Sequence, residues 1–316
     1  MSATTEHVKT RFLFLSDTHC SLPFEDDDPS EPFRTPLPAA DVLIHSGDLT
    51  IRGSRVEHER ALALIASIEA ELKIVVPGNH DITLDHSYYR EHYAQHTRKP
   101  KLSDSKLAEI KDLYTGKEAQ AKGIVYLEEG ISQFHLKNGA RLKVYASAWQ
   151  PEFCNWAFGY PRSTDRFNPA TDDSSTGPEN PVPDYDAVDH IDVMITHGPP
   201  MGILDETIHG MNVGCEHLRR AVERCRPKIH AFGHIHEGHG ALLKTWDVGD
   251  DDTPTMTTPE KDQPEGRSIF VDATGVEPPR STLFINASIM TVNYEPHNAP
   301  WLVDVNLTRA EKREGE

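Results

Sequence analysis

Five short apolar runs in this chain each end in a group of aspartate, asparagine or histidine side chains. The third is the clearest, because residues 73–77 (KIVVP), which are rich in β-branched side chains, lead directly into Gly78-Asn79-His80-Asp81. A short β-branched run that is bounded by proline and glycine predicts a buried strand. In open α/β sheets, ligands bind where the carboxyl ends of the strands meet. The stretch therefore predicts a strand that presents polar side chains at a binding edge.

The other four runs follow the same rule. The runs and the side chains after them are 11–15 with Asp17 and His19, 41–45 with Asp48, 191–195 with His197, and 227–232 with His234 and His236. A single histidine at a strand end is usually a structural residue with a hydrogen-bond partner. Five such ends in one chain are hard to explain in that way, and we expect these side chains to meet in one site.

The order of the elements predicts an α/β layered fold. A helix is expected over residues 56–72, where apolar residues recur at helical spacing between the second and third runs. Residues 88–120 are mostly helical in pattern, and a short helix is expected over 215–225. Further strands are predicted over 124–127, 131–136, 142–146, 283–287, 290–294 and 301–305.

Length and composition bound the organisation of the chain. At 316 residues it is expected to form a single domain over 1–316, with a surface insertion at about 247–281, where the sequence is acidic and rich in proline and threonine. The stretch 149–160 is rich in aromatic residues, which leaves two interpretations open: packing in the core, or one wall of a substrate pocket.

The net charge of −18 restricts the partners of the chain. An acidic surface repels the backbone of duplex nucleic acid and an anionic membrane face, so neither is expected as a partner. A phosphate-ester substrate would need local positive charge, which bound metal ions can supply. The four cysteines have irregular spacing and are expected to be free thiols. The sequence shows neither a secretory signal nor a membrane span, so a cytoplasmic location is expected.

The side chains at the five strand ends form a donor set of carboxylate and amide oxygens and imidazole nitrogens, without a thiolate. This set favours divalent ions such as Mn²⁺, Fe²⁺, Zn²⁺ or Mg²⁺. Seven candidate ligands are too many for one ion that keeps open positions. They suit two ions roughly 3.5–4 Å apart that share a carboxylate.

The order of these motifs resembles that of the calcineurin-like metallophosphoesterase superfamily. The matching blocks are Asp17-Thr18-His19, Gly47-Asp48, Gly78-Asn79-His80-Asp81, Thr196-His197-Gly198 and Gly233-His234-Ile235-His236. The stretches 196–200, 232–238 and 283–294 are similar to the metallophosphoesterase domain-containing protein 1/2 subfamily, which is like the class III phosphodiesterases. The resemblance implies a four-layer α/β/β/α sandwich with two central mixed β-sheets, as in the metallo-dependent phosphatases.

The resemblance also implies roles for the residues. Asp17, His19 and His236 would hold the first metal ion, while Asn79, His197 and His234 would hold the second, with Asp48 shared by both. Two divalent ions are implied, with Mn²⁺ ranked first, and a hydroxide between them would attack phosphorus, which gives Asp48 a catalytic part. His80 would contact the phosphate together with Asn79 and would protonate the leaving oxygen.

One departure from the superfamily bears on the substrate. Protein phosphatases of this superfamily carry Gly-Asp-x-x-Asp-Arg-Gly, and this chain has Ile51 in place of the second aspartate, which orients the catalytic histidine. We therefore expect a small phosphodiester, such as a cyclic nucleotide or an aryl diester, to be the substrate. Two alternatives stay open. The protein could be a phosphomonoesterase or protein phosphatase, or it could be a non-catalytic scaffold that binds nucleotides. Arg52 and His209 are further candidates for substrate contact, and the sequence does not determine the oligomeric state.

Overall fold

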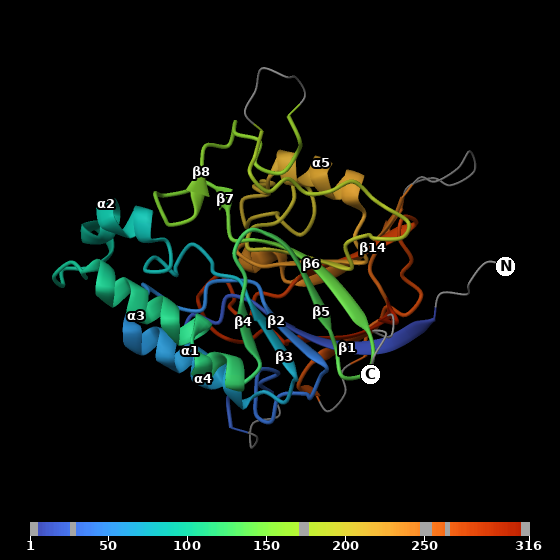
Figure 1. Cartoon of the computed structure of the whole chain (residues 1–316), viewed down its shortest axis with the longest axis horizontal. Helices are drawn as coiled ribbons and strands as arrows, with labels where there is room; N and C mark the ends of the chain where they lie inside the picture. Colours follow the sequence, from blue (N-terminus) through green and yellow to red (C-terminus); the bar gives the residue numbers. More distant parts are fainter. Residues whose placement is uncertain (1–5, 26–29, 171–176, 247–254, 263–265, 311–316) are drawn as a thin grey trace, which may run out of the picture.

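The computed structural model of the protein describes residues 6–25, 30–170, 177–246, 255–262 and 266–310. Two large β-sheets form its centre (Figure 1). The first sheet has the strand order β13 (Ile269–Asp272), β15 (Trp301–Thr308), β1 (His7–Leu15), β2 (Val42–His45), β3 (Leu72–Val75) and β4 (Ile124–Tyr126). The second has the order β12 (Thr255–Thr257), β11 (Gly240–Thr245), β14 (Ser281–Asn286), β10 (Ile229–Phe232), β9 (Val193–Thr196), β6 (Arg141–Ser147) and β5 (Gly130–His135). A small separate pair consists of β7 (Gln150–Pro151) and β8 (Gly159–Tyr160).

Both sheets are mixed. In the first sheet β1, β2, β3 and β4 run parallel, whereas β15 is antiparallel to β1. In the second sheet β6, β9, β10 and β14 run parallel, and β5 and β11 pair with their neighbours in the antiparallel direction. Parallel strands end at the same edge of a sheet, so each sheet gathers its carboxyl ends on one side.

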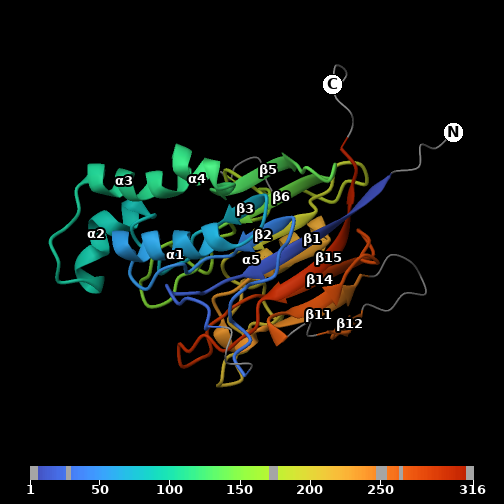
Figure 2. The ribbon, with the colours of Figure 1, turned by 90° about the horizontal axis from the view of Figure 1, so that it is seen from below.

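Helices cover the outer faces of the two sheets (Figures 1 and 2). The helices are α1 (Arg55–Ser67), α2 (His86–His96), α3 (Asp104–Thr115), α4 (Lys117–Ala121), α5 (Glu216–Cys225) and the single 3₁₀ turn η1 (His236–Gly238). α1, α3 and α4 lie beside the first sheet, and α5 lies over the second. Among the described residues, none of these helices combines the length and the apolar character that a membrane crossing requires.

The alternation of side chains along the strands of the second sheet explains the layers. Met194 and Phe284 point toward α5 and pack in a cluster with its residue Val222. Their neighbours Ile195 and Ile285 point the other way and join the core that fills the space between the two sheets. A strand with apolar residues on both faces is buried between two layers. The predicted four-layer α/β/β/α sandwich is therefore confirmed.

The strand predicted over residues 290–294 is wrong. The backbone turns there, because the N–H of Tyr294 donates to the carbonyl of Thr291 at 3.0 Å. Tyr294 also has a φ of +59°, which lies outside the strand region. The apolar residues of this segment suggested a strand, but they belong to a loop at the edge of the sheets.

The range 247–281, predicted as a surface insertion, contains strands that its composition did not indicate. Residues 247–254 and 263–265 lie outside the described residues. In the remainder, β12 pairs with β11 and β13 pairs with β15. The range thus supplies an edge strand to each of the two large sheets. Its interpretation as an insertion within one domain stays a prediction.

A buried histidine links α1 to its neighbours and gives the fold a predicted sensitivity to acid. His58 Nδ1 lies 2.7 Å from the hydroxyl of Tyr114 on α3, and Nε2 lies 2.8 Å from the hydroxyl of Thr83. Burial lowers the pKa of His58 to about 3, so the ring is neutral in the fold. Below pH 6.5 the unfolded chain takes up a proton that the folded chain does not bind. We expect His58 alone to reduce the free energy of unfolding by about 1.4 kcal/mol per pH unit between pH 6.5 and 3.

Urea unfolding of the metal-free protein at pH 7.5, 6.5 and 5.5 measures this dependence. In the His58→Gln variant the decrease between pH 6.5 and 5.5 should be smaller than in the wild type, whereas the exposed His135→Gln serves as the control and should match the wild type. Equal pH dependence of the wild type and His58→Gln would contradict the prediction.

Candidate metal centre

The five predicted strand ends come together at one edge of the sandwich. β1, β2 and β3 are neighbours in the first sheet, and β9 and β10 are neighbours in the second. Beyond β1 the chain joins the two sheets, because the N–H of Ser16 donates to Ala287 at 2.9 Å and the N–H of Ile289 donates to Ser16 at 2.9 Å. These bonds hold the carboxyl ends of both sheets side by side, so residues from opposite halves of the sequence share one site.

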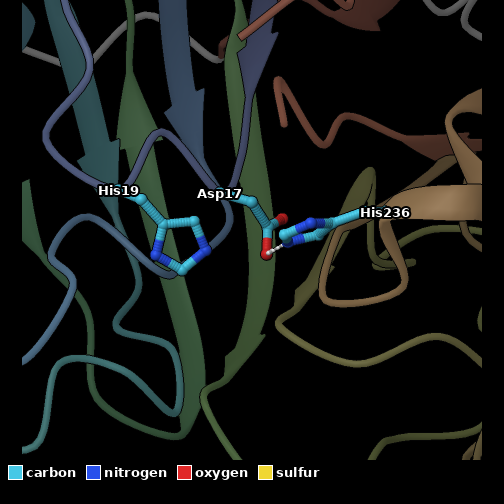
Figure 3. A group of neighbouring side chains, drawn as sticks. All are labelled: Asp17, His19 and His236. Carbon is cyan, nitrogen blue, oxygen red and sulfur yellow. Dashed lines mark ion pairs between the residues drawn. The ribbon is translucent and has the colours of Figure 1, made fainter. Parts of the chain in front are cut away.

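The side chains that follow these strands form groups with the spacing of metal ligands. In each group, one donor atom from every residue lies within 4.8 Å of the others. The groups are Asp17, His19 and His236 (Figure 3), then Asp48, His197 and His234, and a third that consists of His19, Asp48 and His80. Asn79 joins the second group, since its Oδ1 lies 2.9 Å from Nε2 of His197. The structure therefore brings together all seven residues predicted as metal ligands.

Backbone carbonyl groups orient three of the histidines. In each ring Nδ1 donates to a carbonyl oxygen: His19 to Thr50 at 2.9 Å, His197 to Ser46 at 3.0 Å, and His236 to Thr291 at 3.1 Å. The Nε2 atoms then face the carboxylates, with His236 Nε2 3.4 Å from Asp17 Oδ1 and His197 Nε2 3.4 Å from Asp48 Oδ1. Histidines that bind metals are held in this way, because the second nitrogen fixes the orientation and the tautomer of the ring.

An unpaired buried nitrogen shows that the residues present fit a metal ion. Nε2 of His19 is closed off from solvent and has no hydrogen-bond partner, and its nearest ion-pair contact is Asp48 Oδ2 at 3.7 Å. A buried polar atom without a partner is costly, and an ion between these side chains would satisfy it. The oxygen and nitrogen donors suit the divalent ions named above. Asp17, His19 and His236 would hold one ion, and Asn79, His197 and His234 the other, with Asp48 between the two groups.

The electrostatics of the site favour charged aspartates. Burial alone would raise the pKa of Asp17, but the hydrogen bond and charge of His236 lower it below its ordinary value. Burial also disfavours the charged form of His197 and would lower its pKa, but the charge and the hydrogen bond of Asp48 raise this pKa to about 9. In contrast, burial lowers the pKa of His234 to about 3. The carboxylates thus favour positive charge at His197, which a bound metal cation would supply in place of a proton.

Three glycines allow the ligands to approach one another. A Cβ atom on Gly47 would overlap the ring of His197, one on Gly78 would overlap Asp48, and one on Gly233 would overlap the carboxylate of Asp17. Each of these glycines directly precedes a predicted ligand in the sequence. Packing therefore explains why glycine precedes Asp48, Asn79 and His234, because only glycine lets one of these loops contact the next.

The ligands themselves stand on strained backbone. Asp17, Asp48 and His234 have φ values of 51°, 52° and 67°, in the left-handed region that residues other than glycine rarely adopt. Such strain persists only when the surroundings impose it, and it gathers at functional sites. The tight turns at the ends of β1, β2 and β10 are therefore shaped by the site that they carry.

Asp81 is a site residue whose role the sequence did not predict, although it closes the Gly78–Asp81 motif. It is fully buried, and its carboxylate accepts hydrogen bonds from the N–H of Leu49 at 3.2 Å, of Thr50 at 2.9 Å and of Gly78 at 2.8 Å. It also accepts from the hydroxyl of Thr50 at 2.7 Å. Asp81 thus ties the loop after β2, which carries Asp48, to the loop after β3.

We expect Asp81→Ala to reduce the free energy of unfolding by about 3–5 kcal/mol, because three buried N–H groups lose their acceptor. Urea unfolding measures the loss, and elemental analysis should show reduced metal content. Asp165→Ala is the control: that carboxylate also accepts bonds within a loop but lies outside the metal centre. If the two variants lost equal stability and kept their metals equally, this role of Asp81 would be wrong.

His80 lies at the mouth of the site and is held from three sides. Its backbone N–H donates to Asp48 Oδ1 at 2.8 Å, and its ring stacks on Trp156 with 4.0 Å between centroids. Nδ1 of His80 donates to the backbone carbonyl of Ile51 at 2.9 Å. A main-chain carbonyl thus orients the ring at the position where the protein phosphatase motif has an aspartate. His80 is thus oriented in this chain without a carboxylate at position 51.

A cavity of about 500 Å³ opens beside these residues. Asp48, Asn79, His80 and His209 all line it, as predicted for residues near the substrate. Arg52 does not line this cavity. It lies in a neighbouring hollow, where its guanidinium donates to the carbonyl of His96 at 3.3 Å. The contact of Arg52 with substrate therefore stays a prediction without support from the geometry.

Exposed apolar side chains surround the mouth of this cavity. Their exposed fractions are 71% for Phe153, 69% for Ile208, 55% for Met211, 44% for Val292 and 55% for Tyr294, and we call these five residues the apolar collar. The ring of Tyr294 lies 5.1 Å from that of His19 and 5.0 Å from that of His236, between centroids. Of these five residues, the sequence indicated only Phe153 as a possible pocket residue, because it lies in the aromatic stretch 149–160.

Residues 10–238 match the calcineurin-like phosphoesterase family, and this match covers every predicted ligand. The chain belongs to the calcineurin-like phosphoesterase family. The resemblance that the sequence motifs indicated is thereby confirmed. Membership in this family, together with the ligand groups at the sheet edge, makes the protein a metal-dependent phosphoester hydrolase.

Relatives of the chain extend over most of its length. It is 30% identical over 306 residues to metallophosphoesterase domain-containing protein 1 of Homo sapiens and of Mus musculus, which covers 95% of this chain and 72% of each of those proteins. A solved structure, that of phosphopantetheinyl hydrolase from Mycobacterium tuberculosis, aligns with 88% of both chains at 14% identity and a TM-score of 0.41.

Proposed function

We propose that this member of the calcineurin-like phosphoesterase family hydrolyses small phosphodiesters that carry an apolar or aromatic group, such as a cyclic nucleotide or an aryl diester. The observation that carries the proposal is the apolar collar around the cavity that contains Asp48, Asn79 and His80. Two divalent ions are proposed as cofactors, with Mn²⁺ first among them. The position of Asp48 beside members of both ligand groups supports a pair of ions.

The residues of the chain would have two roles, the binding of charged groups and the donation of a proton. Two divalent ions held by the ligand groups would supply stabilisation of negative charge on the phosphate and a water of lowered pKa as the nucleophile. Asn79 would orient the phosphate. Nδ1 of His80 donates its hydrogen bond to the carbonyl of Ile51. Nε2 is therefore the nitrogen that would donate a proton to the leaving oxygen. The stack on Trp156 keeps the ring of His80 in this position.

The lining of the cavity supports a diester rather than a monoester. A phosphate diester carries one negative charge and organic groups on two oxygens, whereas a monoester carries up to two charges. The cationic side chain on the wall, Arg162, donates to the backbone carbonyls of Val213 and Gly214 at 2.8 and 2.7 Å. The collar instead provides apolar surface for an organic group. Charge and surface together therefore favour an ester of low charge.

A panel of substrates tests the proposal. With added Mn²⁺, bis(p-nitrophenyl) phosphate and a cyclic nucleotide should be hydrolysed with a kcat/KM at least about tenfold above that of p-nitrophenyl phosphate. Elemental analysis of the purified protein, run in parallel, reports metal content. Turnover of the monoester far above the diesters would contradict the proposal, and so would a metal-loaded protein that binds nucleotides without hydrolysing them.

A collar variant provides the matched control for this panel. Phe153→Ser should raise KM for the aryl diester several-fold and leave the metal content unchanged. Ile131→Ser removes a comparably exposed apolar side chain on β5, away from the cavity, and should leave KM unchanged. Equal kinetics in the two variants would show that the collar does not contact the substrate.

A further inference from the structure

A second cavity, of about 670 Å³, lies at the opposite end of the sandwich from the metal centre. β1 begins there at His7 and β15 ends there at Thr308, and the two residues are paired (Figure 2). Lys228 lines this cavity just before β10, and His234 follows β10 at the metal centre. Five residues, four of them in β10, lie between Lys228 and His234, and a chain of this length spans roughly 20 Å when extended. The cavity is therefore distinct from the site of phosphoester hydrolysis.

The lining of this cavity is basic, although the chain as a whole carries a net charge of −18. Its charged and titratable lining residues include His7, Arg141, His190, Lys228, Glu277 and Arg309. Glu277 is the single acidic residue among those that line it. The guanidinium of Arg141 contacts Asp189 at 3.5 Å, but the same carboxylate also binds Lys143 at 2.6 Å. One carboxylate thus serves two cations, whereas Arg309 has its own partner in Glu6 at 2.7 Å, so Arg141 and Lys228 are the lining cations that an anion would contact.

Lys228 is the lining residue whose charge a bound anion would stabilise most. Its side chain is buried, with 5% of the residue exposed, and among the described residues it has neither a hydrogen bond nor an ion pair. The two other buried lysines of the described chain have partners: Lys73 donates to the carbonyl of Ala66 at 3.0 Å, and Lys244 contacts Glu223 at 3.5 Å. Burial of an ammonium is costly and lowers the pKa of Lys228, and the nearby charges of Asp192 and Glu277 offset only part of this effect. An anion in the cavity would offset this cost.

The remaining walls suit an organic group attached to the anion. Tyr185 stacks on His190 with 6.0 Å between ring centroids and an interplanar angle of 26°, and both line the cavity with Val276. A cavity of this volume, with apolar walls and a few cationic groups, has the features of a small-molecule site.

We propose that this cavity is a binding site for a small organic phosphate, whose phosphate group contacts Lys228 and Arg141. Guanidinium and ammonium groups together form charge-assisted hydrogen bonds with phosphate oxygens. The proposal does not depend on the reaction at the metal centre.

Calorimetric titration and thermal unfolding of the metal-free protein, in EDTA and at constant ionic strength, test this site. The probes are inorganic phosphate and phenyl phosphate, with sodium chloride as the reference salt. Phenyl phosphate at saturation should raise the Tm of the wild type by about 3 °C or more. Lys228→Met should remove this rise. The control Lys244→Met, which removes a lysine of similar burial elsewhere, should retain it.

A second variant keeps the test informative if Lys228→Met does not fold. Arg141→Gln should weaken the binding of phenyl phosphate about tenfold in calorimetric titration, as expected for the loss of one charge-assisted hydrogen bond. Neither substitution should change Mn²⁺-dependent hydrolysis of an aryl diester. The proposal is overturned if neither probe binds the wild type, or if both variants bind the probes as tightly as the wild type does.

Discussion

The Asp48→Asn variant should lose at least about 1,000-fold of the Mn²⁺-dependent hydrolysis of bis(p-nitrophenyl) phosphate. Asp48 lies between the two ligand groups, with Oδ2 3.7 Å from Nε2 of His19 and Oδ1 3.4 Å from Nε2 of His197. The change removes the negative charge that both ions would share but keeps the size of the side chain. Asparagine can still accept the hydrogen bond from the N–H of His80, so the loop should keep its shape.

Kinetics and elemental analysis of the same samples measure the effect. The variant should contain less metal than the wild type, and circular dichroism should show an unchanged fold. Asp272→Asn is the control, because Asp272 is an exposed aspartate at the end of β13 whose carboxylate accepts a hydrogen bond from the N–H of Thr274. A variant at position 48 with full activity would show that Asp48 is not the shared ligand and would remove the basis for a paired metal site.

The second large effect is expected at His80. His80→Asn should lower kcat by about 100- to 10,000-fold while the metal content stays that of the wild type. The ring lies close enough to His19 and Asp48 to be considered a ligand, but its Nδ1 is committed to the carbonyl of Ile51. Loss of activity without loss of metal separates proton transfer from metal binding.

The leaving group provides a sharper test of the same prediction. An aryl diester that releases p-nitrophenolate needs little protonation of the leaving oxygen, whereas a diester that releases an alkoxide needs much. The loss in His80→Asn should therefore be at least about tenfold greater for the alkyl ester. His92→Asn replaces a histidine of α2 outside the cavity and serves as the control. If the variant lost its metal ions, or lost equal activity toward both esters, His80 would not be a proton donor.

The convergence of the candidate ligands at one sheet edge could be predicted because its cause is local. Each ligand follows a short apolar strand and a tight turn, and parallel strands bring their carboxyl ends to one edge whatever the details of packing. Glycine before Asp48, Asn79 and His234 is visible in the sequence for the same reason, since only glycine fits between ligand loops. The four-layer arrangement followed from the resemblance that these motifs carried, and it is confirmed.

Other parts of the site depend on contacts between distant segments. Tyr294 reaches His19 and His236 only because its loop turns at a positive φ, and apolar residues around it suggested a strand instead. Asp81 acquires its role from N–H groups on two loops that the fold brings together. No local pattern reveals such contacts, because hydrogen-bond acceptors and exposed apolar residues look alike in sequence wherever they lie.

The chemistry that this protein can carry is encoded locally, since the donor atoms and the strands that present them lie within a few residues of each other in the sequence. The surroundings of these donor atoms depend instead on how distant segments pack together. The carbonyl that orients His80, the apolar collar and the unpartnered ammonium of Lys228 all follow from how the two sheets and their loops pack. Packing sets burial and distance, and these in turn determine whether a common side chain becomes part of a site.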